Sequence, residues 1–93
     1  MLEPAQADKM LQLAHNAREE ASKALGQALP LIQDKLCIAI LKYAKTMVDA
    51  CETHLLPGVA ARTLNATSHV LANSPAGGVL AVLDVAEKLV RDD

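Results

Sequence analysis

Aromatic side chains are almost absent from this sequence of 93 residues, which contains no Phe, no Trp and only one Tyr, Tyr43. Alanine and leucine supply two thirds of the apolar residues, and apolar residues make up 52% of the chain. Strands favour aromatic and β-branched residues, whereas alanine and leucine favour helices. The composition therefore predicts an all-α fold and excludes a disordered acidic chain.

The chain has room for one domain, because 93 residues fall within the range of a single compact unit. For a mass of 9.8 kDa, surface scaling gives roughly 14,000 Å² of accessible area in the unfolded chain and about 5,000 Å² in the folded chain. We therefore expect residues 1–93 to form a single helical domain with one modest core.

A concentrated positive charge is also missing. The formal net charge is −2. The group that comes closest to a basic cluster consists of Lys35, Lys42 and Lys45. Proteins that bind a nucleic-acid duplex neutralise several phosphates with clustered Lys and Arg, and only Tyr43 lies among these lysines to stack on a base. The pattern predicts a solvated helix face and no nucleic-acid partner.

The sequence contains no evident targeting or membrane-spanning segment. The first four residues lack the basic and apolar regions of a signal peptide. The charge-poor stretch 63–83 is long enough to span a bilayer, but it contains several polar residues, a proline and two glycines. Cys37 and Cys51 are fourteen positions apart, about 21 Å along a helix, which is too far for a disulfide within the chain. We therefore expect a cytoplasmic protein with reduced thiols and no membrane partner.

Proline and glycine divide the sequence into helical segments. Four sites have the pattern of a helix start: Pro4, Pro30, Pro57-Gly58 and Ser74-Pro75. They predict a small bundle of helices at about 4–27, 30–55, 58–72 and 76–91. We expect the first two to form a long antiparallel hairpin on which the two shorter helices pack. The alternative for the segment from Gly26 to Pro30 is a kink between two collinear helices.

The first predicted helix carries a narrow seam that is almost entirely alanine. Its apolar positions follow a 4-3-4-3-4 spacing: Met10, Ala14, Ala17, Ala21, Ala24 and Ala28. This heptad spacing puts all of them on one side of the helix. Small side chains bury little area, but they allow a neighbouring helix to approach closely.

The second predicted helix has more apolar surface than one neighbour can cover. Two adjacent heptad rows are apolar, one comprising Leu36, Ile40, Tyr43, Met47 and Ala50, and the other Cys37, Leu41, Ala44, Val48, Cys51 and Leu55. Residues 36–41 are apolar on every side of the helix, so they must be covered on every side. A central position in the bundle or a second subunit provides that cover, and we expect a homo-oligomer, in the first instance a dimer.

Charged side chains are almost missing from residues 53–83, where Arg62 is the only one. An anion can bind near Arg62, because the first turn of a helix offers unpaired N–H groups and partial positive charge. Thr63, Asn65 and His69 are the candidates to add hydrogen bonds to such a ligand. The alternative is an exposed arginine beside an ordinary helix start.

No motif for catalysis or for a cofactor is apparent. Cys51 and His54 have the spacing of two metal ligands, but a structural zinc site needs four, which only a second subunit would supply. Ser68 and His69 are adjacent and lack the sequence surroundings of a hydrolase nucleophile. We therefore expect no enzymatic activity, no metal site within the chain and no cofactor.

Two hypotheses about function follow from these observations. The first is a non-enzymatic protein-interaction module, such as a small regulator, adaptor, chaperone or inhibitor, that acts as a homo-oligomer through apolar helix faces. Its candidate interface residues are Ile38, Leu41, Ala60, Leu64 and Leu71. The alternative is a module that binds a small molecule or an anion around Arg62, at a helix N-terminus or at a subunit interface.

Overall fold

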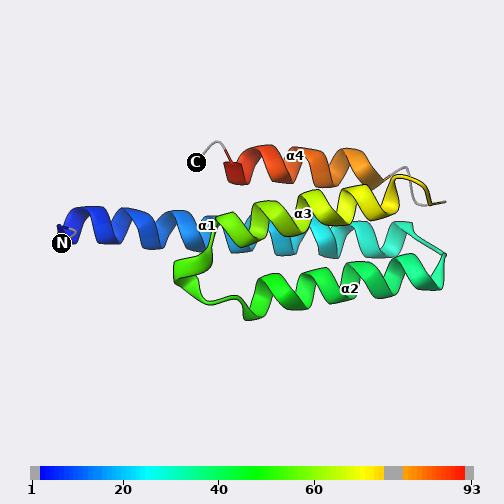
Figure 1. Ribbon diagram of the computed structural model, residues 1–93, viewed down its shortest axis with the longest axis horizontal. Helices are drawn as coiled ribbons and strands as arrows, with labels where there is room; N and C mark the ends of the chain where they lie inside the picture. The colour runs from blue at the N-terminus through cyan, green and yellow to red at the C-terminus, as the bar shows by residue number, and fades with distance from the viewer. Residues whose placement is uncertain (1–2, 75–78, 92–93) are drawn as a thin grey trace.

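The described part of the chain folds into a bundle of four α-helices that alternate in direction (Figure 1). The structure is a computed structural model and describes residues 3–74 and 79–91. The helices are α1 (Pro4–Ala28), α2 (Lys35–Ala50), α3 (Gly58–Leu71) and α4 (Leu80–Arg91). Short 3₁₀ turns, Leu29–Leu31 and Thr53–Leu55, follow α1 and α2. The predicted all-α bundle is confirmed, and the described residues contain no strand.

The helices form a ring in which each contacts the next, and α4 closes the ring by packing on α1. In addition, α1 contacts α3 across the bundle. Figure 1 shows α2 and α4 on opposite sides of the pair formed by α1 and α3. The first and third helices therefore each contact all three others, and α1 is the longest of the four.

The alanine seam of α1 is buried from Ala14 to Ala28, as its spacing predicts. The larger side chains that fill the core include Leu25, Leu41, Leu64, Leu71 and Leu83, all of them fully buried. The prediction for Met10 is wrong, because this residue is 55% exposed. Met10 lines an open pocket with Thr53, His54 and Leu56 of the segment that follows α2, and no helix covers it there.

The second helix is shorter than the predicted span of 30–55 at both ends. Pro30 lies in a 3₁₀ turn and Ile32 is extended, so the helix begins only after Asp34. The Asp34 carboxylate accepts a hydrogen bond from the backbone N–H of Cys37 at 2.9 Å, which lowers the pKa of Asp34. Capping by an aspartate satisfies an N–H group that has no partner within the helix.

At the other end of α2, a side chain of α1 contacts the backbone of the helix. Cys51 has extended backbone angles, and its carbonyl accepts a hydrogen bond from the Arg18 guanidinium. A cation at the carbonyl end of a helix also interacts favourably with the helix dipole. Arg18 and Cys51 are far apart in the sequence, so local patterns do not reveal this helix end.

The remaining boundaries agree closely with the prediction where they are described. α1 continues through Gly26 to Ala28 and the chain then reverses into α2, so the alternative of two collinear helices is wrong (Figure 1). Ser74 donates its backbone N–H and its hydroxyl to the Leu71 carbonyl, at 3.0 and 2.6 Å, and so satisfies the end of α3. The predicted start of the fourth helix at residue 76 lies outside the described residues. None of the described helices combines the length and the apolarity that crossing a bilayer requires.

We expect the substitution Ala21→Leu to lower the free energy of unfolding by about 1–3 kcal/mol, because Ala21 is fully buried and the added atoms have no room in the seam. The control is Ala5→Leu in the exposed first turns of α1, where we expect a change within about 0.5 kcal/mol. Urea unfolding followed by circular dichroism measures both. Equal stabilities would contradict the role given to the alanine seam.

Candidate functional site

A groove with an apolar lining runs between α2 and α3. Its volume is about 450 Å³. It is lined by Ile40, Tyr43, Ala44 and Met47 of α2 and by Val59, Arg62, Thr63, Ala66, Thr67 and Val70 of α3. Apart from Arg62 and the two threonines, every lining side chain is apolar except for the hydroxyl of Tyr43. A concave, apolar surface with a few polar groups is typical of binding sites.

The groove exists because α2 has two apolar rows and the bundle covers only one. The row of Cys37, Leu41, Ala44 and Val48 is buried against α1 and α3. In the adjacent row, Leu36, Tyr43 and Met47 lie on the outer surface of the bundle, and Ile40 is partly buried against the core. One helix cannot direct two rows into the same narrow core, so the second row forms a wall of the groove.

The exposed row is unusual for the size of its side chains. Leu36 and Tyr43 are each 70% exposed, Met47 is 43% exposed, and Val70 on the opposite wall is 57% exposed. We use the name groove face for the surface formed by these four residues together with the residues that line the groove.

A second exposed apolar surface lies between α1 and α4. Val85 is 58% exposed and Leu89 is 49% exposed. Around them a shallow depression of about 470 Å³ is lined by Glu20, Lys23, Ala24 and Gln27 of α1 and by Ala81, Val82, Val85, Ala86 and Leu89 of α4. We call this surface the α1–α4 face. It differs from the groove face in carrying charges of both signs at its edge.

The four predicted ligand residues do not form one site. Arg62 and Thr63 line the groove, where Arg62 is exposed and forms no ion pair within the described residues. Asn65 instead belongs to a polar cluster with α4. His69 is exposed in the last turn of α3 and does not line the groove. Arg62 therefore faces an apolar groove without Asn65 or His69 as co-ligands.

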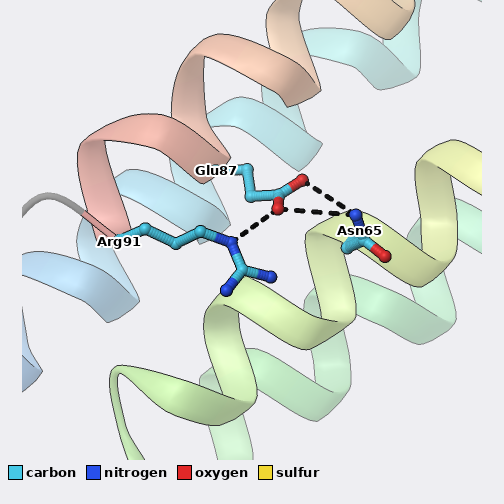
Figure 2. Close-up of polar contacts among 3 residues, drawn as sticks. All are labelled: Asn65, Glu87 and Arg91. Atoms are coloured by element: carbon cyan, nitrogen blue, oxygen red, sulfur yellow. Dashed lines mark hydrogen bonds and ion pairs between the residues drawn. The ribbon is translucent and has the colours of Figure 1, made fainter.

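The polar cluster joins α3 to α4 (Figure 2). Asn65 Nδ2 lies 3.4 Å from each carboxylate oxygen of Glu87, and Arg91 Nε donates to Glu87 Oε2 at 2.6 Å. The hydrogen bond from Arg91 is the main cause that lowers the pKa of Glu87, and the contact with Asn65 lowers it further. Partial burial of the carboxylate acts in the opposite direction. We interpret this cluster as a structural contact between α3 and α4, because Asn65, Glu87 and Arg91 already have one another as partners.

The predicted interface residues lie in a different place from the one that the sequence suggested. Leu41, Ala60, Leu64 and Leu71 are fully buried in the core of the single chain, and Ile38 is partly buried against that core. Their side chains are covered by the chain's own helices, so a second subunit cannot contact these four. The assignment of these four residues to an interface is therefore corrected. Among the apolar residues 36–41, some belong to the core and others to the row that starts at Leu36.

Cys51 and His54 do not converge on a common ligand. His54 Nδ1 lies 3.3 Å from a Glu52 carboxylate oxygen, and the Cys51 thiol contacts the Glu52 carbonyl at 3.4 Å. Within the described residues, no group of three or more His, Cys, Asp or Glu side chains is arranged to hold a metal ion. Cys37 and Cys51 are both free thiols.

Sequence patterns place Tyr43 and Met47 in an apolar row of the second helix, but they do not mark these residues, Val59 or Val70 as the lining of a groove. The signal was present for α2, since two adjacent apolar rows on a helix of a four-helix bundle leave one row uncovered. Which row faces outward depends on how α2 is rotated against α1, and periodicity does not fix that rotation. For α3, the apolar residues are too evenly spread to separate the core side from the groove side.

Comparison with known proteins identifies no relative: the chain matches no protein-family model, no curated protein and no solved structure. Conclusions about its function therefore depend on the surfaces described above.

We expect Glu87→Gln to lower the free energy of unfolding by less than about 1 kcal/mol at pH 7, because the pair with Arg91 is partly exposed. The pKa of Glu87 is lower in the folded chain than its ordinary value of 4.5, so its contribution is present above that value and disappears as the pH falls through the folded pKa. Urea unfolding at neutral and acidic pH measures this.

The difference between wild type and Glu87→Gln should therefore shrink as the pH falls below about 4.5. Asp84→Asn is the control on the same helix, because Asp84 is exposed and forms no ion pair within the described residues. A difference for Glu87→Gln that persists at low pH would contradict the ionic origin of the effect.

Proposed function

We propose that this chain is a non-enzymatic protein-interaction module that assembles as a homo-oligomer, in the first instance a dimer, through an apolar helix face. The observation that carries the proposal is the grouping of exposed large apolar side chains on continuous faces. Scattered apolar residues are normal on any surface, but contiguous patches mark sites of interaction. The groove face and the α1–α4 face are both patches of this kind.

The exposed area of the single chain supports self-association. It amounts to 5938 Å², against about 5,200 Å² expected for a monomer of 9.8 kDa. The excess of roughly 800 Å² is similar to the area of about 800 Å² that each partner buries in an interface of standard size. One such contact would return the exposed area per chain to the ordinary range.

The α1–α4 face is the better candidate for contact with a second copy. In a twofold dimer, a patch on one chain contacts the identical patch on the other chain. Each charged residue in the patch can therefore be paired only by a residue of opposite charge that belongs to the same patch. The α1–α4 face meets this condition because Glu20 and Lys23 border its apolar centre. Val85 and Leu89 supply large apolar side chains at that centre.

The alternative of a free anion bound around Arg62 has less support. Asn65 is engaged with Glu87, which leaves Arg62 as an exposed guanidinium beside apolar side chains. An isolated surface cation binds a small anion only weakly in water, because the dielectric constant and dissolved salt screen the attraction.

We also propose a cytoplasmic location. The free thiols of Cys37 and Cys51 are consistent with it, because disulfides are rare in a reducing compartment.

The test is the mass of the protein in solution, measured by sedimentation equilibrium over about a hundredfold range of concentration. We expect the wild type to reach the mass of a dimer and Val85→Glu to remain monomeric, because a charge at Val85 would be buried in the contact. Circular dichroism should be unchanged, since Val85 is 58% exposed in the single chain.

Tyr43→Glu on the groove face is the control, and it should dimerise like the wild type. A wild-type protein that stays monomeric at every concentration would refute the proposed self-association. Loss of the dimer in Tyr43→Glu, with the dimer retained in Val85→Glu, would show that the groove face is the contact instead.

A further inference from the structure

We infer that the two copies in the proposed dimer meet with their α1 helices antiparallel, so that Glu20 of each copy pairs with Lys23 of the other. This inference rests on the proposed self-association through the α1–α4 face, and it adds the orientation of the two chains and the residues that select it. It follows from the unpaired charges of that face, from the heights of its charged and apolar side chains along the helices, and from the cost of the other twofold arrangement.

The α1–α4 face contains one acidic and one basic side chain that are free to pair with a second copy. Glu20 and Lys23 both line the depression between α1 and α4. Within the described residues, neither of them forms an ion pair. Glu20 is partly buried, whereas Lys23 is exposed. Opposite charges that border one apolar patch give a contact between two copies its charge complementarity.

A twofold axis that runs across α1 sets Glu20 of one copy opposite Lys23 of the other if it crosses midway between these two residues. They are three positions apart, about 4.5 Å along the helix, and the axis makes the two α1 helices antiparallel. The part of α1 that lines the depression extends from Glu20 to Gln27. The required axis lies two residues, about 3 Å, from the centre of this range, towards Glu20.

The large apolar side chains of α4 place the axis at the same height. The part of α4 that lines the depression extends from Ala81 to Leu89. The midpoint between Val85 and Leu89 is also two residues, about 3 Å, from the centre of its range, towards Leu89. Because α4 runs opposite to α1, the Leu89 end lies beside the Glu20 end (Figure 1). One axis therefore brings together both the opposite charges and the large apolar side chains of the two copies.

The other twofold arrangement of the same face covers charges without pairing them. An axis parallel to the helices keeps each residue at its own height and sets α1 of one copy on α4 of the other. Glu20 would then lie on Leu89, and Lys23 would lie near Val85, in both copies. Covering a carboxylate or an ammonium group with apolar side chains is costly unless an opposite charge compensates. The arrangement with antiparallel α1 helices is therefore the favourable one.

The test uses two variants of the full chain that each give the face charges of one sign. Glu20→Lys makes both charges positive and Lys23→Glu makes both negative, so each variant repels its own copy. We expect sedimentation equilibrium at low salt to give each variant alone a dimer Kd at least about tenfold higher than that of the wild type. An equimolar mixture should return to within about threefold of the wild-type Kd, because opposite charges again face each other in the mixed dimer.

Glu19→Lys is the matched control. Glu19 is exposed on the same helix and does not line the depression, so the same change of charge there should leave the dimer Kd within about twofold of the wild-type value. Circular dichroism checks that each variant keeps its helical content. High salt should narrow the difference between the single variants and their mixture, since it screens the charges.

The outcomes separate this inference from the proposed self-association. If the wild type dimerises and Val85→Glu does not, but the mixture of the two charge variants dimerises no better than either alone, the antiparallel pairing is wrong and the proposed dimer stands. Charge variants that each dimerise like the wild type would contradict the pairing in the same way. A wild type that is monomeric at every concentration would overturn both the dimer and the pairing.

Discussion

The structure depends on the close packing of three helices around the alanine seam of α1. Side chains as small as Ala21 fill little space, so the core is narrow and its bulk comes from leucines, most of them on the other helices. In a core of this width, each outer helix has room for one buried row. α2 has two apolar rows, and the one that begins at Leu36 is therefore left on the surface. The seam in α1 thus determines that α2 presents an apolar wall to solvent.

The two exposed faces differ in a way that separates their uses. The groove face combines large apolar side chains with Arg62 and is bordered by helices without an unpaired acid. The α1–α4 face combines Val85 and Leu89 with charges of both signs. A surface of mixed charge can complement itself, whereas a surface of one sign needs a different partner. On this ground we propose the α1–α4 face, which carries charges of both signs, as the surface that joins two copies of the bundle.

Polar contacts between helices decide details that apolar packing leaves open. Arg18 reaches from α1 to the carbonyl of Cys51 and marks the end of α2. Asn65 and Glu87 connect α3 to α4, and this contact removes Asn65 from any site around Arg62. Each contact joins residues on different helices. Sequence patterns within one helix contain no information about them.

The sequence by itself determined the all-α fold, the seam from Ala14 to Ala28 and the positions where three of the helices begin or end, because composition, heptad spacing and proline act locally along the chain. It also indicated that α2 has more apolar surface than one neighbour covers. It did not determine which of its rows is buried, nor that Leu64 and Leu71 fill the core rather than an interface. Only the tertiary structure decided these points, because they depend on the rotation of each helix about its axis, which is set by all its neighbours at once.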